Sequence, residues 1–208
     1  MEYAKKVIRP GRWDVQIVAD LIQNATYLGS QEQLVMGNSA PLGTPALLSK
    51  RQPQTRPLRE GDQFTLLIEV DGPAGLYAEL GRSFFLGKVP QELHEVNALC
   101  KEAQEVTLRL LKPGADPGEI WRANNEFLVR KGFYPETRLY AHGQGYEKVE
   151  RPAIRDDETM KLKERMNIAL HPVAENDRIW ASLCDNYLIT DSGVSGCLHR
   201  TPKEIIAV

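Results

Sequence analysis

The sequence predicts a mixed α/β fold made of two αβ halves related by a pseudo-twofold axis. The first observation behind this prediction is an internal repeat. Residues 8–29 and 111–132 each carry a basic residue, a Pro-Gly pair, an amphipathic helical pattern and a closing glycine, and the Pro-Gly glycine lies 18 residues before the closing glycine in both. We expect Asp14 and Asp116 to cap the two helices at their N-termini.

The second observation concerns the strands expected after each helix. Apolar, β-rich runs at residues 64–70 and 166–173 are too short for helices. Each is followed by a turn and a second strand, at residues 76–85 and 179–190. A basic residue with Pro-Gly before a helix is a common entry signal, so a chance match is the alternative. The matched lengths and the matched strands after them favour a true repeat.

The remaining elements are predicted from simpler patterns. A long helix should begin near Pro90 and carry apolar residues along one face from Leu93 to Leu110. Residues 30–60 are rich in Gly, Pro, Ser and Thr and are expected to form a long loop near one end of the sheet. The first repeat helix is expected to bury one apolar face, formed by Val15, Val18, Ile22 and Ala25.

Composition narrows the class of protein. The 208 residues, 42% apolar and 26% charged, suit one soluble domain, and a net charge of −2 does not indicate a nucleic-acid partner. Cys100, Cys184 and Cys197 are an odd number without framework spacing, which favours a reducing compartment. The sequence has no apolar run long enough for a membrane span and no apolar signal segment at residues 1–13. We therefore expect a cytoplasmic protein.

One motif stands out at residues 142–152, HGQGYEKVERP. His142 sits on a Gly-x-Gly turn, and glycines allow a backbone to bend sharply or to approach a neighbour closely. A single histidine is a poor metal ligand or proton carrier by itself, so other side chains should converge on it. The alternative is a packed turn histidine that binds nothing.

The order of the motifs resembles the pita-bread family, which includes methionine aminopeptidase, aminopeptidase P, prolidase and creatinase. The motifs are LREGD (58–62), GLYAELGRSF (75–84), LKPG (111–114), HGQG (142–145), ERP (150–152), HP (171–172) and ITDSG (189–193). The resemblance implies a curved antiparallel sheet with two helix pairs and a pseudo-twofold axis. It further implies that residues 1–208 are one catalytic-type domain, that the N-terminal domain of larger members is absent, and that the protein is a homodimer.

In active members of this family, two divalent metals are held by two aspartates, one histidine and two glutamates, and a second histidine handles substrate. The five ligand positions correspond here to Leu67 or Ile68, Glu79, His142, His171 and Cys184, and the second histidine corresponds to Val149. Glu69, beside the first position, substitutes only if the strand register allows it. The ordinary dinuclear site is therefore not encoded.

Two chemical interpretations of the altered site remain open. Glu79, His142, His171 and Cys184 are together a reasonable ligand set for one divalent ion, with zinc as the candidate. Alternatively no metal is bound, as in creatinase, and His142 is the acid–base group with Glu79 or Glu150 tuning it. Taken singly, the residues have simpler explanations: His171 and Cys184 are packed residues, and Glu79 pairs with Arg82.

The resemblance thus predicts a C–N bond hydrolase with a metal-free or single-metal site, acting on a small-molecule or peptide-like ligand. Tyr77 and Arg82 are candidate substrate-binding residues. The alternative is a catalytically inactive relative that serves as a binding or dimerisation module. Val149 in place of the second histidine favours the inactive relative, whereas polar residues at four ligand positions favour the enzyme.

Overall fold

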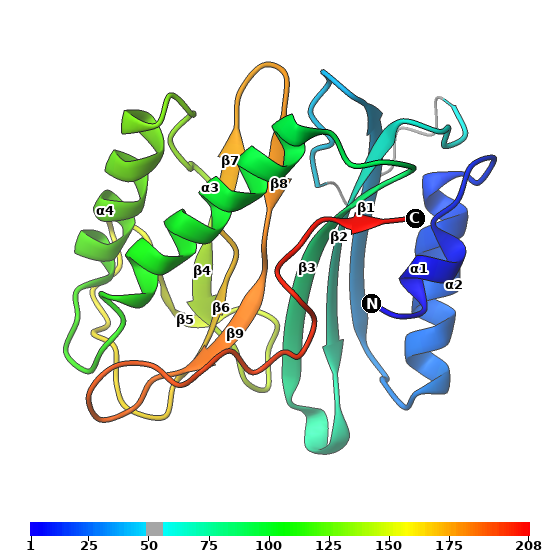
Figure 1. Ribbon diagram of the computed structural model, residues 1–208. Coiled ribbons are helices and arrows are strands. Elements are labelled where there is room, and N and C mark those ends of the chain that lie inside the picture. The colour runs from blue at the N-terminus through cyan, green and yellow to red at the C-terminus, as the bar shows by residue number, and fades with distance from the viewer. Residues whose placement is uncertain (49–55) are drawn as a thin grey trace.

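A computed structural model describes residues 1–48 and 56–208. Figure 1 shows two four-stranded sheets side by side, with α1 and α2 against the first and α3 and α4 beside the second. The elements in chain order are α1 (Ala4–Val7), α2 (Asp14–Tyr27), β1 (Gln33–Pro41), β2 (Asp62–Asp71), a short 3-10 helix (Pro73–Gly75), β3 (Tyr77–Phe85), α3 (Gln91–Leu108), α4 (Pro117–Arg130), β4 (Ala141–Gly143), β5 (Glu150–Ala153), β6 (Asn167–Leu170), β7 (Val173–Glu175), β8 (Trp180–Ser182), β9 (Asp185–Leu188) and β10 (Ile206–Ala207).

The first sheet has the strand order β1-β2-β3-β10, in which β10 runs parallel to β3. Side chains alternate between its two faces. Phe64 and Phe84 point toward α2 and share a buried core with Ile17. The residues that alternate with Phe64 along β2 and with Phe84 along β3 point to the opposite face. On that face Glu69 of β2 lies directly across from Glu79 of β3. The face away from the helices is therefore the one that carries buried acids.

Strand β1 corrects one prediction, because it lies where we expected loop. All nine of its residues pair with β2. The strand passes so close to the core that a Cβ atom at Gly37 would lie 2.6 Å from the ring of Phe64. Small and polar residues are typical of loops, but here they let β1 cross an aromatic ring, so tertiary packing overrides local propensity. Residues 42–48 are irregular as predicted, and residues 49–55 lie outside the described part.

The second half repeats the first with its long strands divided. In the first half, α2 is followed by β1 and then by β2 and β3; in the second half, α4 is followed by β4 and later by β6 and β9. The second sheet has the strand order β5-β4-β6-β9, and β7 and β8 form a separate hairpin. The run predicted at residues 166–173 ends its first strand before His171 and Pro172. Proline has no N–H to donate to a ladder, so the pairing breaks there.

A β-bridge joins the two sheets, between β3 and the residue just before β9. Gly81 and Cys184 exchange two main-chain hydrogen bonds, each 3.1 Å long. A Cβ atom at Gly81 would lie 2.8 Å from the Cβ of Cys184, so only glycine permits this approach. The bridge places Glu79 of the first half beside Cys184 of the second.

The helices also refine the predictions. Asp116 caps α4, accepting from the N–H groups of Gly118 and Glu119, as expected. Asp14 is instead the first residue of α2, and its carboxylate accepts from the N–H of Ser39 on β1. α2 buries Asp14, Ile17, Val18 and Leu21, so the predicted face with Val15 and Ile22 was wrong by part of a turn.

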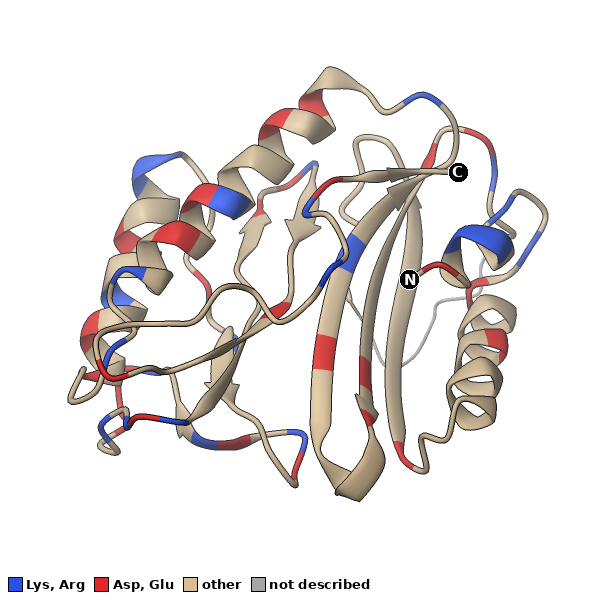
Figure 2. Ribbon diagram, turned by 60° about the horizontal axis from the view of Figure 1, so that its bottom comes forward, with Lys and Arg blue, Asp and Glu red and all other residues tan. Residues whose placement is uncertain are grey.

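The C-terminal residues connect both halves. Ser195 and Leu198 donate main-chain hydrogen bonds to the edge of β9, and the chain then crosses to pair β10 with β3 (Figure 1). Figure 2 shows that charged residues lie mostly on the helices and connecting loops, with few on the strands of the first sheet. None of the helices in residues 1–48 and 56–208 has the length and apolar character that crossing a bilayer requires.

Candidate functional site

Three predicted ligands meet where the two halves join. Glu79 lies on β3, His142 on β4, and His171 just after β6. Their donor atoms all lie within 4.8 Å of one another. Nε2 of His142 is 3.4 Å from one oxygen of Glu79, and Nε2 of His171 is 3.8 Å from the other. The structure therefore brings together one carboxylate and two imidazoles at a buried point.

The electrostatics of the three groups differ. Burial lowers the pKa of His171 to about 4, which leaves its imidazole neutral despite the nearby carboxylate. Burial opposes charge on His142 as well, yet Glu79 raises the pKa of that histidine above its ordinary value. Burial also opposes charge on Glu79, but His171 and His142 hold the pKa of this carboxyl below its ordinary value. The site thus favours a Glu79 carboxylate beside one chargeable and one neutral histidine.

The same arrangement fits a metal ion. The ring nitrogen Nδ1 of His142 is 2.9 Å from the carbonyl of Gly143, which only accepts, so Nδ1 carries a proton and, in the neutral ring, Nε2 is the nitrogen that can bind an ion. The neutral His171 likewise offers a lone pair. Two histidines and one glutamate are a ligand set typical of catalytic zinc sites, which leave one position open. The residues present therefore fit one divalent ion.

Cys184, the fourth predicted ligand, is adjacent to the cluster. Its thiol lies 3.2 Å from a Glu79 oxygen and donates to it. Burial raises the pKa of Cys184 well above its ordinary value, and the charge of Glu79 adds to this effect. Among the described residues, its sulfur is not part of the set whose donors all lie within 4.8 Å of one another. The thiol is therefore a hydrogen-bond donor to the cluster in this structure.

Glu69 is a site residue that the sequence left conditional on strand register. The register pairs it directly with Glu79, so both carboxylates project from the same face. Burial raises the pKa of Glu69 to about 7, and the charge of Glu79 contributes. Gln144 donates a 2.8 Å hydrogen bond to it. Leu67, also on this face, is an apolar neighbour of Gly81 and offers no ligand atom.

The glycines of the HGQG motif serve close approach. Neither Gly143 nor Gly145 has a positive φ. A Cβ atom at Gly143 would lie 2.6 Å from the carbonyl oxygen of Arg151, and one at Gly145 would lie 2.9 Å from the carboxylate of Glu150. The motif therefore packs against the following strand, which keeps His142 in its place on β4.

The other predicted residues lie around the centre rather than in it. Tyr77 and Glu150 line a cavity of about 530 Å³ together with Gly143 and Gln144, which directly follow His142. The hydroxyl of Tyr77 contacts Glu32 and Lys148, which ties the motif's loop to the first sheet. Glu150 accepts from the N–H of Glu147. Val149, at the position of the family's second histidine, is 54% exposed.

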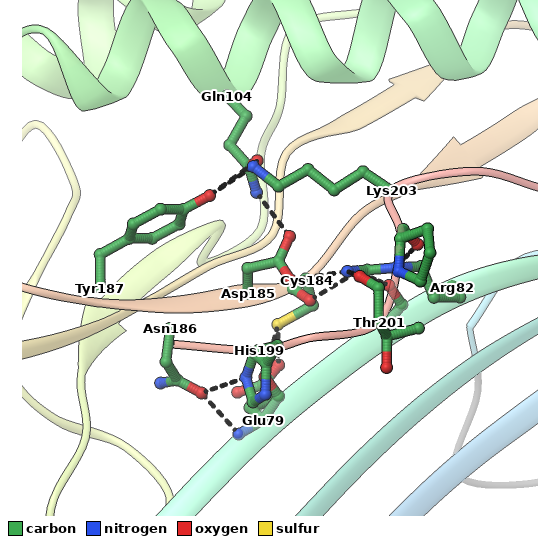
Figure 3. A network of polar contacts seen from close by, with 12 residues as sticks. Glu79, Arg82, Gln104, Cys184, Asp185, Asn186, Tyr187, His199, Thr201 and Lys203 are labelled. Carbon is green, nitrogen blue, oxygen red and sulfur yellow. Dashed lines mark hydrogen bonds and ion pairs between the residues drawn. The ribbon is translucent and has the colours of Figure 1, made fainter. Parts of the chain in front are cut away.

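Arg82 has a structural environment. It is fully buried and pairs with Asp185 at 2.7 Å instead of with Glu79. Its other donors reach four main-chain carbonyls, those of Gly81, Cys184, Thr201 and Pro202. Figure 3 shows this network joining β3, β9 and the C-terminal segment. Together these five hydrogen bonds use all three nitrogen atoms of the guanidinium group. No donor of Arg82 is left for a substrate, so its proposed binding role has no support here.

Comparisons with known proteins place this arrangement in a family. The model of metallopeptidase family M24 matches residues 1–191. No curated protein matches in a sequence search. Among solved structures, the X-Pro aminopeptidase of Thermotoga maritima is 21% identical with a TM-score of 0.86, and 99% of this chain covers 58% of that one. The prolidase of Pyrococcus horikoshii is 20% identical with a TM-score of 0.82, and 98% of this chain covers 58% of that one.

A third structure, the methionine aminopeptidase of Rickettsia prowazekii, is 16% identical with a TM-score of 0.72 over 93% of this chain and 89% of its own. At these identities the likeness shows the fold alone. The chain spans under three fifths of the X-Pro aminopeptidase and the prolidase, at 58% of each. The mixed α/β architecture and these neighbours confirm the predicted pita-bread fold. The chain belongs to metallopeptidase family M24.

Proposed function

We propose that the chain is a hydrolase of C–N bonds in peptide-like molecules, with a single-ion centre of Glu79, His142 and His171. The observation that carries this proposal is the convergence of three donor groups within 4.8 Å. The structural neighbours include an X-Pro aminopeptidase and a prolidase, which supports a peptide-like ligand. The cavity beside Gly143 and Gln144 has a volume, about 530 Å³, that suits a small molecule or a short peptide.

Each residue has a role that its environment explains. A bound zinc ion supplies a Lewis acid and a water of lowered pKa. His171 offers a neutral ring nitrogen because burial disfavours its charge. His142 presents Nε2 because its other nitrogen donates to Gly143. Glu79 supplies the single negative charge of the set and is held in place by the thiol of Cys184. Tyr77 and Glu150 line the cavity beside Gly143 and Gln144 and are the proposed ligand-contacting groups.

The metal-free interpretation uses the same residues. The raised pKa of His142 favours its protonated form beside the Glu79 carboxylate. At 3.4 Å the pair is longer than an ordinary hydrogen bond and is held as an ion pair. In this version His142 is the general acid, and the Glu79 carboxylate stabilises its positive charge. Metal content separates the two versions.

A second candidate function is a catalytically inactive binding module, and two observations favour it. Glu79 and His142 are each 3% exposed, so a substrate has little direct access to them. Val149 lies at the position of the family's substrate-handling histidine. A homodimer and a cytoplasmic location stay predictions.

Elemental analysis of protein purified without chelator tests the centre. We expect about one zinc per chain, lost in His171→Ala and in Glu79→Gln because each removes a ligand. His94→Ala is the matched control, since His94 lies exposed on α3. Protein without zinc that also fails to take up added zinc would reject the single-ion centre.

Activity is tested on the zinc-loaded and metal-free protein with dipeptides, N-acyl amino acids and guanidino acids. We expect no ordinary turnover of X-Pro dipeptides with manganese or cobalt, because a second ion has no complete ligand set. Turnover of another C–N substrate that is lost in His142→Ala and kept in His94→Ala supports the hydrolase. An inert protein across this panel supports the binding module instead.

A further inference from the structure

We propose that Gln144 is a positioning residue that withholds Glu69 from the ion and thereby sets the metal preference of the centre. This inference rests on the single-ion centre proposed above. With Glu69 withheld, the ligands are two nitrogens and one carboxylate, a set that suits zinc. With Glu69 included, the set gains a second carboxylate and becomes more favourable for an oxygen-preferring ion such as Mn²⁺.

Glu69 is placed where it would otherwise join the ligands. It lies directly across from Glu79 in the β2–β3 ladder, and such pairs have Cβ atoms about 4.5–5.5 Å apart. It is only 3% exposed, so water does not solvate it freely. A buried carboxylate needs a hydrogen-bond donor or a cation as a partner. Yet among the described residues the converging set contains only Glu79, His142 and His171.

The hydrogen-bond donor that partners Glu69 is Gln144. Its side-chain nitrogen donates to Glu69 at 2.8 Å and to the carbonyl of Lys148 at 3.2 Å. Its side-chain oxygen accepts from Asn186 at 2.9 Å. The amide is therefore engaged at both ends, and its donor end faces the carboxylate. The amide therefore satisfies the buried carboxylate of Glu69 with a neutral donor, so that Glu69 does not need the ion as its partner.

The orientation of this amide is set by a main-chain group. The side-chain oxygen of Asn186 accepts from the N–H of Glu79 at 2.8 Å, so its nitrogen must point the other way, toward Gln144. Figure 3 shows Asn186 contacting Glu79 and His199 in this way. Because a main-chain N–H cannot be inverted, the donor end of Gln144 is directed at Glu69.

The backbone of Gln144 is held as firmly as its side chain. Asn167 donates to its carbonyl at 3.0 Å, and its own N–H donates to the carbonyl of Asn167 at 3.0 Å. Asn167 also accepts from Asn186 at 3.2 Å. Gln144, Asn167 and Asn186 thus form a closed set of amides beside the centre. The hydrogen bond from Gln144 to Glu69 is therefore part of a network of amides and does not depend on one side chain alone.

The test compares Zn²⁺ and Mn²⁺ affinities of the full chain by competition with a chelator of known affinity. Gln144→Met keeps the side-chain length but removes the donor. We expect it to tighten Mn²⁺ binding by about tenfold and to change zinc binding less, in line with the effect of groups that orient ligands. Gln144→Met combined with Glu69→Gln should return to the wild-type preference. Gln91→Met, at an exposed position of α3, is the matched control.

Each result is decisive. Unchanged Mn²⁺ affinity in Gln144→Met overturns the inference while leaving the single-ion centre intact. If Gln144→Met fails to fold, by near-UV circular dichroism, Glu69→Gln alone decides: unchanged ion affinity supports a withheld Glu69, and a loss of affinity shows that Glu69 is already a ligand. Wild-type protein that binds neither ion overturns the centre itself, and the inference falls with it.

Discussion

Replacement of Gly81 by alanine should loosen the junction between the two halves. The added Cβ would lie 2.8 Å from the Cβ of Cys184 and 3.3 Å from a methyl carbon of Leu67. Saturated carbons do not approach within 3.0 Å, so β3 and β9 must separate. That movement strains the two main-chain hydrogen bonds of 3.1 Å that join the sheets.

The size of the effect combines the clash and the weakened hydrogen bonds. Forcing a methyl group into a packed site costs about 1–3 kcal/mol. Weakening two main-chain hydrogen bonds adds up to about 1 kcal/mol for each. We therefore expect the free energy of unfolding to fall by about 2–4 kcal/mol. Urea unfolding followed by circular dichroism measures it, with Gly193→Ala as control, because nothing lies within 4 Å of a Cβ at Gly193.

A second substitution tests whether the clash is the cause. Cys184→Gly removes the atom that the new methyl group meets, so Gly81→Ala combined with Cys184→Gly should be more stable than the two separate losses predict. The reasoning is refuted if Gly81→Ala stays within about 0.5 kcal/mol of wild type, as an ordinary surface change would. Additive losses in the double variant would equally refute it.

Two further predictions concern charged groups outside the centre. Arg82→Met should lower the free energy of unfolding by about 3–5 kcal/mol, because it leaves the fully buried Asp185 without its cation, and Arg82→Met with Asp185→Leu should cost less than Arg82→Met alone. Denaturant unfolding measures both, and a double variant less stable than the single one would contradict the argument. A hydrogen bond from Arg151, opposed by burial and aided by backbone N–H donors, lowers the pKa of Glu158 from 4.5 to about 2. The stabilising effect of the Glu158 carboxylate is therefore complete above pH 4.5 and is lost as the pH falls toward 2. The difference in free energy of unfolding between wild type and Glu158→Gln should close over that range. A difference that does not depend on pH would count against this.

Much of the fold was predictable because its strongest signals are local and occur twice. Paired Pro-Gly helix entries and the hairpins after them indicated two halves, and both halves are present. β1 was missed because Gly37 and its small neighbours have the composition of a loop, while their reason for being small is the ring of Phe64. The repeat itself contained the missing signal: β1 follows α2 as β4 follows α4, so a strand at either place implied one at the other.

The centre was predictable only in part. The resemblance brought Glu79, His142 and His171 to one place, and the structure has them together. Glu69 depended on a register that a one-residue change in the β2–β3 turn would reverse. The amides that hold it come from three separate segments, at Gln144, Asn167 and Asn186, and each looks like an ordinary polar residue in the sequence. Hydrogen bonds between distant segments leave no periodic pattern to find.

The charges around the proposed centre favour one ion over two. A buried charge needs a compensating partner, since desolvation otherwise costs more than the fold can supply. In the proposed centre, one divalent cation has the carboxylate of Glu79 as a ligand and the carboxyl of Glu69 nearby, with His142 and His171 neutral as ligands. A second divalent cation would leave two positive charges unbalanced, because neither Leu67 nor Ile68 supplies a carboxylate. Without any ion, a protonated His142 balances Glu79, and the raised pKa of Glu69 keeps that carboxyl from adding a full second charge. The same side chains are therefore close to neutral with one ion or with none, which is why metal content and not geometry separates the two versions of the proposed chemistry.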